Sequence, residues 1–203
     1  MTILLIRHGE TDGNASRIIQ HPETPLNANG REQANRVAAK IAKIGNIEII
    51  LSSDYCRARE TAEKISEKTV APLTYSQSLR ERNFGDLRGK AYDEIKDIDL
   101  FAEDYVPPLG ESWVKFRERV DSAWNEIIER KSNSLGTIAV VTHGLFIRSL
   151  IERTLHIDEE LSRSELIVEN TSITYVTGSA PWTVKALATT NHLDTEHRAS
   201  GII

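Results

Sequence analysis

Cysteine and long apolar runs are the scarcest features of this sequence. Its 203 residues include one cysteine, Cys56, so a disulfide within the chain is excluded. No apolar run approaches the roughly 20 residues that a membrane-spanning helix requires, and Met1 leads directly into an apolar segment without a signal peptide. We therefore expect a cytoplasmic protein that does not associate with membranes. We interpret Cys56 as a small packing residue rather than a nucleophile.

The sequence also lacks an excess of positive charge and any metal-ligand spacing. It contains 25 Lys and Arg against 30 Asp and Glu, which gives a net charge of -5. This balance disfavours nucleic acid as a partner, because polyanion binding depends on Lys and Arg that neutralise phosphates. No cluster of His, Asp or Glu has the i, i+4 spacing of a metal site, and no Cys-x-x-Cys is present. We therefore predict neither a metal site nor a bound cofactor.

Repeats, low-complexity tracts and Pro/Gly/Ser-rich linkers are absent as well, which favours one soluble domain over residues 1–203. Strand and helix signals alternate along the chain. The alternation favours an α/β fold with a mainly parallel central sheet and helices on both faces. Strands are predicted at residues 2–6, 47–51, 72–75, 137–141, 172–176 and 182–188. Helices are predicted at residues 54–68, about 112–131 and 145–155. A further helix is predicted to begin after its cap at Asn27 and to end at Gly45.

An apolar strand at residues 2–6 runs directly into Arg7, His8 and Gly9. His8 is therefore expected at the carboxyl end of its strand, which is where open α/β sheets bind ligands. Gly9 and Gly13 are expected to let the following backbone approach a ligand closely. A lone Arg-His pair more often just ends a strand, so the weight of this interpretation comes from the rest of the chain.

A second strand, at residues 137–141, delivers His143 and Gly144 in the same way. Arg57 follows the strand at residues 47–51. Two imidazoles and two guanidiniums would thus gather at the carboxyl ends of neighbouring strands. Such a cluster is suited to a phosphate group, because charged donors form strong hydrogen bonds with its oxygens.

Four motifs occur in an order that resembles the histidine phosphatase superfamily, also called phosphoglycerate mutase-like, over residues 2–187. They are residues 5–11 with Asn14, residues 52–54 with Arg57 and residues 61–62, residues 79–85 followed by Gly89, and residues 141–144. The resemblance implies a three-layer α/β/α sandwich. It also implies a lid or insert at about residues 82–115.

The resemblance implies a catalytic set of His8, Glu81, His143, Arg7 and Arg57, and a substrate-binding set of Arg7, Asn14, Gln20, His21, Arg57, Glu81 and Gly144. His8 would be the nucleophile, and the neighbouring arginines should disfavour its imidazolium form. Glu81 would donate the proton to the leaving group, because a carboxyl beside a phosphate dianion should have a raised pKa. Glu10 is expected to serve positioning or a helix-end contact, and Glu111 to help order the lid.

Several positions depart from the family pattern. His21 stands where many relatives carry glycine, Thr24 where they often carry aspartate, and Arg88 where many carry glutamate. These positions therefore do not name a substrate.

The predicted activity is that of a metal-independent, histidine acid-phosphatase-like hydrolase. It would cleave phosphate monoesters of small phosphorylated metabolites through a phosphohistidine, as a monomer or homodimer. A cofactor-dependent phosphoglycerate mutase is the alternative, and a non-catalytic phospho-ligand-binding module is an alternative of another class. The predicted lid is short, and residues 91–110 carry six acids, Asp93, Glu94, Asp97, Asp99, Glu103 and Asp104, against Lys96. An acidic lid should repel a polyanion, which favours the phosphatase.

Overall fold

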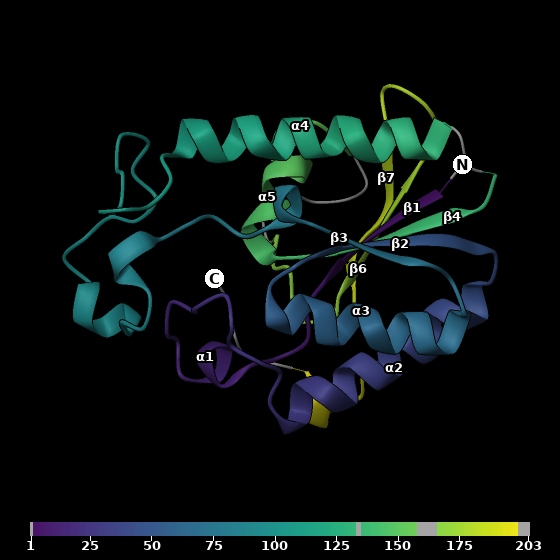
Figure 1. Ribbon diagram of the computed structural model, residues 1–203, viewed down its shortest axis with the longest axis horizontal. Coiled ribbons are helices and arrows are strands. Elements are labelled where there is room, and N and C mark those ends of the chain that lie inside the picture. Colours follow the sequence, from purple (N-terminus) through teal and green to yellow (C-terminus); the bar gives the residue numbers. More distant parts are fainter. Residues whose placement is uncertain (1, 133–134, 158–165, 199–203) are drawn as a thin grey trace.

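Seven strands form one sheet at the centre of the fold (Figure 1). The structure is a computed structural model that describes residues 2–132, 135–157 and 166–198. The spatial order of the strands is β3-β2-β4-β1-β6-β7-β5. β6 runs antiparallel to β1 and β7, and every other pairing is parallel. The strands are β1 (Thr2–Arg7), β2 (Ile47–Ser53), β3 (Leu73–Ser76), β4 (Thr137–Thr142), β5 (His156–Ile157), β6 (Ile173–Thr177) and β7 (Thr183–Thr189).

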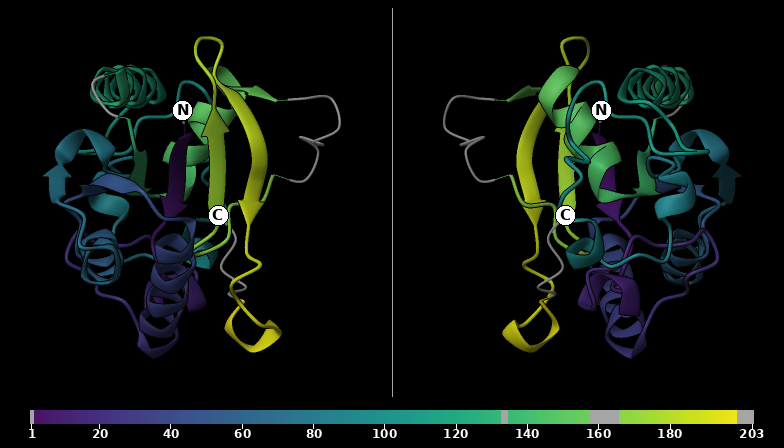
Figure 2. Two further views of the ribbon diagram at one scale, coloured as in Figure 1. Left: turned by 90° about the vertical axis from the view of Figure 1, so that its right-hand side faces the viewer. Right: turned by 90° about the vertical axis from the view of Figure 1, so that its left-hand side faces the viewer.

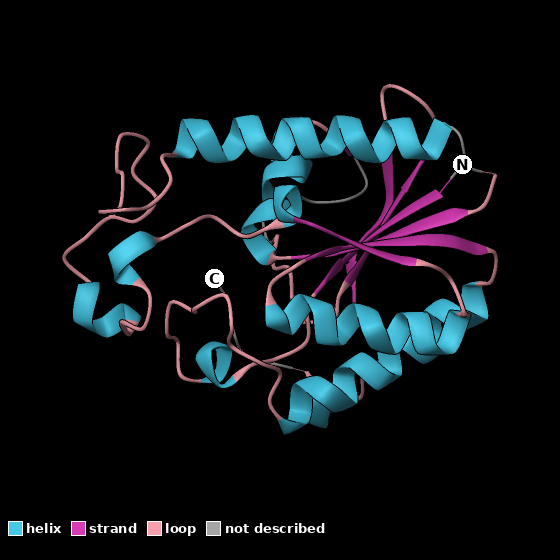
Figure 3. Ribbon diagram, viewed as in Figure 1, coloured by secondary structure: helices cyan, strands magenta, loops and turns pink. Residues whose placement is uncertain are grey.

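Helices cover both faces of the sheet, as Figures 2 and 3 show from different sides. On one face lie α2 (Ala28–Ile44) and α3 (Cys56–Thr69), and on the other lie α4 (Trp113–Ser132) and α5 (Gly144–Arg153). The chain also forms α1 (Asp12–Ala15) and four 3-10 turns, η1 (Gln77–Leu79), η2 (Gly85–Leu87), η3 (Tyr92–Ile95) and η4 (Thr195–His197). This is the predicted three-layer α/β/α arrangement.

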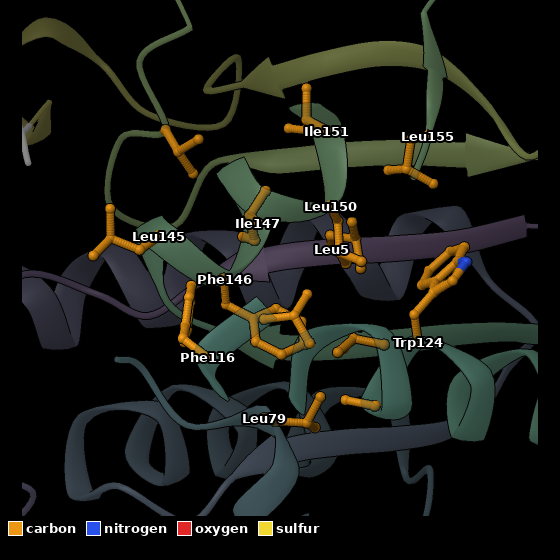
Figure 4. Packing of buried hydrophobic residues seen from close by; sticks show 14 of the residues in the cluster. Leu5, Leu79, Phe116, Trp124, Leu145, Phe146, Ile147, Leu150, Ile151 and Leu155 are labelled. Atoms are coloured by element: carbon orange, nitrogen blue, oxygen red, sulfur yellow. The ribbon is translucent and has the colours of Figure 1, made fainter. Parts of the chain in front are cut away.

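The two faces arise from the alternation of side chains along the central strands. Leu4 and Ile6 of β1 belong to the buried cluster beneath α2 and α3. Leu5 points to the opposite face, where it packs with Phe116 of α4 and Phe146 of α5 (Figure 4). Because both faces of β1 and β4 are covered, these strands read as continuous apolar runs.

The predicted elements are confirmed with small shifts at their ends. Asn27 caps α2 by accepting a hydrogen bond from the Gly30 nitrogen at 2.8 Å, and Gly45 ends that helix with a φ of 73°. β6 and β7 pair as an antiparallel hairpin. The sequence analysis missed β5, whose two residues are too few to show a periodic pattern.

Gly9 and Gly13 have a packing role that the sequence did not indicate, and their approach to a ligand stays a prediction. A Cβ at Gly9 would lie 2.6 Å from the Gly30 carbonyl oxygen, and one at Gly13 would lie 2.5 Å from the Gln20 side chain. These glycines therefore permit close packing of the loop after β1 against other parts of the protein.

The lid (residues 82–115) extends beyond the carboxyl ends of the parallel strands (Figure 1). It is organised around the buried guanidinium of Arg82, which donates to the carbonyl oxygens of Leu100, Tyr105 and Glu111 at 2.8 to 3.0 Å. The same guanidinium lies 3.9 Å from the centroid of the Trp113 ring. One buried cation thus joins three separate stretches of the lid to the start of α4.

The described helices include none that combines the length and the apolar character needed to cross a membrane. The extent of a single domain over residues 1–203 stays a prediction.

The packing of α4 yields a stability prediction. Phe116 is fully buried between α4 and the sheet, whereas Val114 on the same helix is 60% exposed. Phe116→Ala should lower the free energy of unfolding by about 3–5 kcal/mol, because it removes buried apolar surface and leaves a cavity. Val114→Ala is the matched control and should change it by less than about 0.5 kcal/mol. Urea denaturation measures both values, and equal losses would contradict the assigned packing.

Candidate active site

Three strand ends bring the predicted residues together. In the sheet, Arg7 of β1 lies opposite Thr142 of β4, and Ser52 of β2 lies opposite Val141 of β4. The residues that follow β1 and β4 therefore emerge at the same edge. His8 and His143 meet there with ring centroids 5.1 Å apart in an edge-to-face arrangement. The predicted pairing of the two imidazoles is present in the structure.

His8 is held by a hydrogen bond at each ring nitrogen. Its Nδ1 lies 2.7 Å from the Gly9 carbonyl oxygen, and its Nε2 lies 3.1 Å from the donating Nε of Arg57. A carbonyl only accepts and a guanidinium only donates, so this network assigns the proton to Nδ1 and the lone pair to Nε2. Burial lowers the pKa of His8 well below 6.5, and the positive charges of Arg57 and Arg7 lower it further. The ring is therefore neutral at neutral pH.

His143 is fully buried, and its Nε2 lies 2.8 Å from the Ser53 hydroxyl. Its Nδ1 has no hydrogen-bond partner among the residues that the structure describes. Burial lowers the pKa of His143 well below 6.5, followed by the effects of Arg57 and His8. A buried polar atom without a partner is costly, so Nδ1 is a natural contact for a ligand.

The two arginines are buried cations. Nη1 of Arg7 donates to the Val168 carbonyl oxygen at 2.6 Å. Nη1 of Arg57 donates to the His21 carbonyl oxygen at 3.1 Å. Burial lowers the pKa of each arginine to about 10, so both remain charged at neutral pH.

Arg57 differs from Arg59 on the same helix. The side chain of Arg59 is 51% exposed and pairs at 3.8 Å with Glu63. Arg59 is therefore a surface cation, whereas the burial of Arg57 agrees with the prediction that it belongs to the site.

Glu81 lines the same small cavity as His8. Its Oε1 accepts from the Arg82 nitrogen and its Oε2 from the Leu145 nitrogen, each at 3.0 Å. These bonds and the two buried arginines favour the carboxylate, but burial outweighs them and raises the pKa of Glu81 above 4.5. The pKa is raised in the protein alone, without the bound phosphate that the sequence analysis invoked.

Asn14 and Gln20 belong to one network beside His8. The Asn14 Oδ1 atom accepts from the nitrogen and the hydroxyl of Thr11 at 3.2 and 3.0 Å, and from Asn170 at 3.3 Å. Since its oxygen is occupied, the Asn14 amide nitrogen is the group left for a ligand. Gln20 lines the small cavity and accepts from the Thr11 hydroxyl at 2.8 Å.

The remaining two predicted binding residues lie less directly at the site. His21 is exposed, and it meets Arg57 through its backbone carbonyl, while its ring lies near Gly89. Gly144 is the first residue of α5, and a Cβ there would lie 3.6 Å from Nε of Arg7. Neither residue lines the small cavity, and the same holds for Arg7, Asn14 and His143.

A small cavity and an open cleft meet at the site. The cavity has a volume of about 30 Å³ and is lined by His8, Arg57 and Glu81 among others. The cleft has a volume of about 880 Å³ and shares Tyr55, Glu81 and Arg88 with the cavity. The cavity is therefore suited to one compact group, and the cleft to the larger part of a ligand.

The six acids of residues 91–110 do not lie at the cavity or the cleft, where their charge would act on a bound ligand. None of Asp93, Glu94, Asp97, Asp99, Glu103 and Asp104 lines the cavity or the cleft. Glu94 accepts from the Ala91 nitrogen at 2.7 Å, and Glu103 pairs with Arg117 at 2.6 Å. The inference that these charges repel a bound polyanion at close range is therefore wrong, because a count of charges does not say where they point.

Four contributors to the site were missed as such. Ser53 contacts His143, Thr61 accepts from the Gly9 nitrogen at 3.0 Å, and Asn170 donates to the His8 carbonyl oxygen at 3.0 Å. Arg82 donates its backbone N–H to Glu81. Ser53 and Thr61 lie inside recognised motifs, which could have marked them. Asn170 carries no such signal, because it reaches the site only through the pairing of β6 with β1.

The other carboxylates and the cysteine take structural places. Glu10 accepts from the side chain of Asn27 at 2.8 Å, which agrees with a helix-end contact. Glu111 pairs with Arg119 at 2.8 Å and accepts from the Asn83 nitrogen at 3.2 Å, which agrees with ordering of the lid. Burial raises the pKa of Cys56 to about 11, so its thiol is protonated. Among the described residues, no three His, Cys, Asp or Glu are grouped so that they could hold a metal ion.

Curated relatives resemble nearly the whole chain. Phosphoglycerate mutase-like protein 4 of Arabidopsis thaliana is 35% identical over 206 residues, which cover 95% of this chain and 86% of that protein. A broad-specificity phosphatase of Saccharomyces cerevisiae is 31% identical over 201 residues, which cover 94% of this chain and 86% of that protein. A probable phosphoglycerate mutase of Escherichia fergusonii is 31% identical over 209 residues, with coverages of 96% and 95%.

Solved structures share the fold. YhfR of Bacillus stearothermophilus has a TM-score of 0.80 and 27% identity, over 94% of this chain and 98% of that chain. A mycobacterial glucosyl-3-phosphoglycerate phosphatase in complex with VO3 has a TM-score of 0.77 and 26% identity, over 93% and 99% of the two chains. The sequence model of the histidine phosphatase superfamily, branch 1, matches residues 3–189. The chain belongs to the histidine phosphatase superfamily.

Proposed function

We propose that this protein is a phosphatase that hydrolyses phosphate monoesters of small metabolites through a phosphohistidine at Nε2 of His8. The observation that carries the proposal is the buried, neutral His8, whose Nε2 lone pair faces Arg57 within hydrogen-bond distance. Relatives named as phosphatases support the reaction class.

In the first step the phosphoryl group occupies the small cavity, and the Arg57 Nε–H transfers its hydrogen bond from His8 to a phosphoryl oxygen. The freed lone pair on Nε2 attacks phosphorus. The Nε2–P bond forms while the bond from phosphorus to the ester oxygen breaks. The departing oxygen takes the proton of Glu81, so that an alcohol leaves and Glu81 becomes a carboxylate.

In the second step the roles of Glu81 reverse. Its carboxylate accepts a proton from a water molecule, and the oxygen of that water attacks phosphorus. The P–N bond breaks, inorganic phosphate leaves, and His8 recovers its lone pair. Glu81 regains its proton, so the cycle closes without an added reductant, oxidant or second substrate.

Positive charge and hydrogen-bond donors stabilise the transferred group in both steps. Arg7 and Arg57 supply the charge, and Nδ1 of His143 and the amide of Asn14 supply further donors. Donation from Nδ1 requires that the Ser53 hydroxyl donates to Nε2 of His143, which their 2.8 Å contact permits. A bound phosphate dianion would raise the pKa of Glu81 further, because it offsets the charge of both arginines. We propose that these residues act without a metal ion.

A phosphoglycerate mutase is the second candidate, because relatives carry that name. The two activities share the first step. They differ in whether water or the second hydroxyl of a bound phosphoglycerate accepts the phosphoryl group. Counting free phosphate and isomerised product in the same reaction separates them, and we expect free phosphate to dominate.

Replacement of the nucleophile tests the proposed covalent step. His8→Ala should abolish turnover and the acid-labile, base-stable phosphoenzyme, because no other group is mounted to attack phosphorus. His156→Ala, at an exposed position in β5, is the control and should retain both. Rapid acid-free quenching with a labelled phosphomonoester measures the phosphoenzyme. A phosphoenzyme that persists in His8→Ala would assign the covalent role to another residue. If the unmodified protein binds the phosphomonoester but forms no phosphoenzyme, the non-catalytic binding module is supported instead.

Leaving groups of different basicity test Glu81. Glu81→Gln should slow hydrolysis of an alkyl phosphate by roughly 10²- to 10⁴-fold, as expected for loss of a general acid. p-Nitrophenyl phosphate should lose much less, because its phenolate leaves without protonation. Steady-state kinetics on both esters make the comparison. Equal losses on the two esters with a matching rise in KM would assign Glu81 to binding instead.

The pH dependence follows from the two opposite pKa shifts. The reactive form needs neutral His8 and protonated Glu81, whose pKa values are lowered and raised respectively. For an alkyl phosphate, kcat/KM should therefore fall as the pH rises through the pKa of Glu81, and as it falls through that of His8. Glu81→Gln should flatten the alkaline limb of this pH profile. The remaining pH dependence in that region should then be the ionisation of the ester itself, with a pKa of about 6. An alkaline limb that is unchanged in this variant would assign it to another group.

A further inference from the structure

The open cleft outside Glu81 carries cations that the hydrolysis steps do not use. Four of its lining residues are positively charged: Arg80, Arg88, Lys115 and Arg119. Carboxylates line the same cleft, so the positive charge available to a ligand depends on which cations are already paired. The four cations differ in whether they form ion pairs with carboxylates of the protein.

Two of the four are paired with carboxylates. Arg80 binds Asp54 through two contacts, Nε to Oδ1 at 2.6 Å and Nη2 to Oδ2 at 2.5 Å. Arg119 binds both oxygens of Glu111, at 3.0 and 2.8 Å. These bidentate pairs hold the walls of the cleft in place and leave little charge for a ligand.

The other two cations form no ion pair with a carboxylate in the described part of the chain. Arg88 is half-buried, and its Nη2 donates to the Tyr55 hydroxyl at 3.1 Å. Lys115 is exposed in the first turn of α4. Three carboxylates line the cleft. Glu111 is paired with Arg119, Glu81 belongs to the reaction, and Glu23 lies close enough to Arg80 to affect its pKa.

The position of Arg88 connects the cleft to the reaction. Arg88 and Tyr55 line both the cleft and the small cavity that His8 lines. A cavity of about 30 Å³ has room for the phosphoryl group alone. The alcohol part of a substrate must therefore pass Tyr55 and Arg88 and extend into the cleft toward α4.

We propose that the alcohol part of the substrate carries a second anionic group, a carboxylate or another phosphate, that Arg88 and Lys115 bind together. An anion at this place gives both unpaired cations a partner. The six acids of the lid do not line the cleft, so they do not oppose the anion at contact range. The inference rests on the proposed function and names the chemical class of its substrate.

Two matched pairs of phosphomonoesters test the proposal. Glycerol 3-phosphate carries a hydroxymethyl group where 3-phosphoglycerate carries a carboxylate. Fructose 6-phosphate and fructose 1,6-bisphosphate differ in a hydroxyl against a second phosphate. At low ionic strength, kcat/KM for phosphate release should be about tenfold higher for the anionic member of at least one pair, because two cations each contribute a few-fold at a partly exposed site. The pair that shows the larger ratio identifies the anion as carboxylate or phosphate.

Charge-removing variants assign the selectivity to the two residues. Arg88→Gln and Lys115→Gln should each lower the ratio of kcat/KM within the preferred pair by about three- to fivefold, mainly through a higher KM for the anionic ester. Arg88→Lys should keep most of the ratio. Lys43→Gln is the control for overall charge, because Lys43 lies on α2 and outside the cleft. This variant should leave the ratio unchanged.

The outcomes separate this proposal from the function on which it rests. Release of phosphate with equal kcat/KM within both pairs would overturn the second-anion proposal and leave the phosphatase intact. Equal losses on anionic and neutral esters in Arg88→Gln and Lys115→Gln would also overturn it. No phosphate release from any of the four esters, together with no phosphohistidine, would overturn the phosphatase itself.

Discussion

The contact between Arg57 and His8 is the interaction on which the site depends. A buried guanidinium donates to the imidazole nitrogen at 3.1 Å and, together with the Gly9 carbonyl at the other ring nitrogen, it fixes the tautomer and orients the ring. Its charge adds to burial in lowering the pKa of His8. The contact exists because α3 begins directly after β2, and because β1 lies beside β4, which lies beside β2. The order of the strands therefore determines the chemistry available at their ends. The same arginine lies 5.1 Å from the centroid of the Tyr55 ring, which links it to the wall of the cleft.

Burial acts on the acid and on the base in opposite directions. Transfer into a low-dielectric site disfavours the charged form of any group, so it lowers the pKa values of His8 and His143 and raises that of Glu81. In all three residues burial is the largest cause, and the charges of the arginines come second or later. One physical effect thus favours the neutral form of the proposed nucleophile and the protonated form of the proposed acid. A site open to water would hold the imidazoles and the carboxyl near their ordinary pKa values, where the two required forms overlap less at neutral pH.

The sequence predicted the site residues that directly follow apolar strands, but it did not predict contacts between residues far apart in the chain. His8, His143 and Arg57 each follow a strand whose apolar run is visible in the sequence, so their convergence could be predicted from the rule that parallel strands end at one edge. The Asn170 contact to the His8 carbonyl joins residues 162 positions apart, and no spacing in the sequence marks it. The lid shows the same limit. Its charges could be counted from the sequence. Whether they face the cleft depends on the fold of the lid, in which the Arg82 guanidinium donates hydrogen bonds to three backbone carbonyl oxygens.

The position of Glu81 is set from two sides by hydrogen bonds from Arg82 and Arg119. Arg82 donates its backbone N–H to the Glu81 carboxylate and anchors the lid with its guanidinium. Arg119 donates to the Glu81 carbonyl at 3.2 Å and to that of Arg80 at 2.7 Å, while it holds Glu111. These bonds use backbone groups, so they place the proposed proton donor without requiring particular side chains along the rest of the cleft. Residues such as Arg88 and Lys115 can therefore differ between proteins of this fold without moving the acid. That separation explains how one phosphate-binding centre can serve substrates with different alcohol parts.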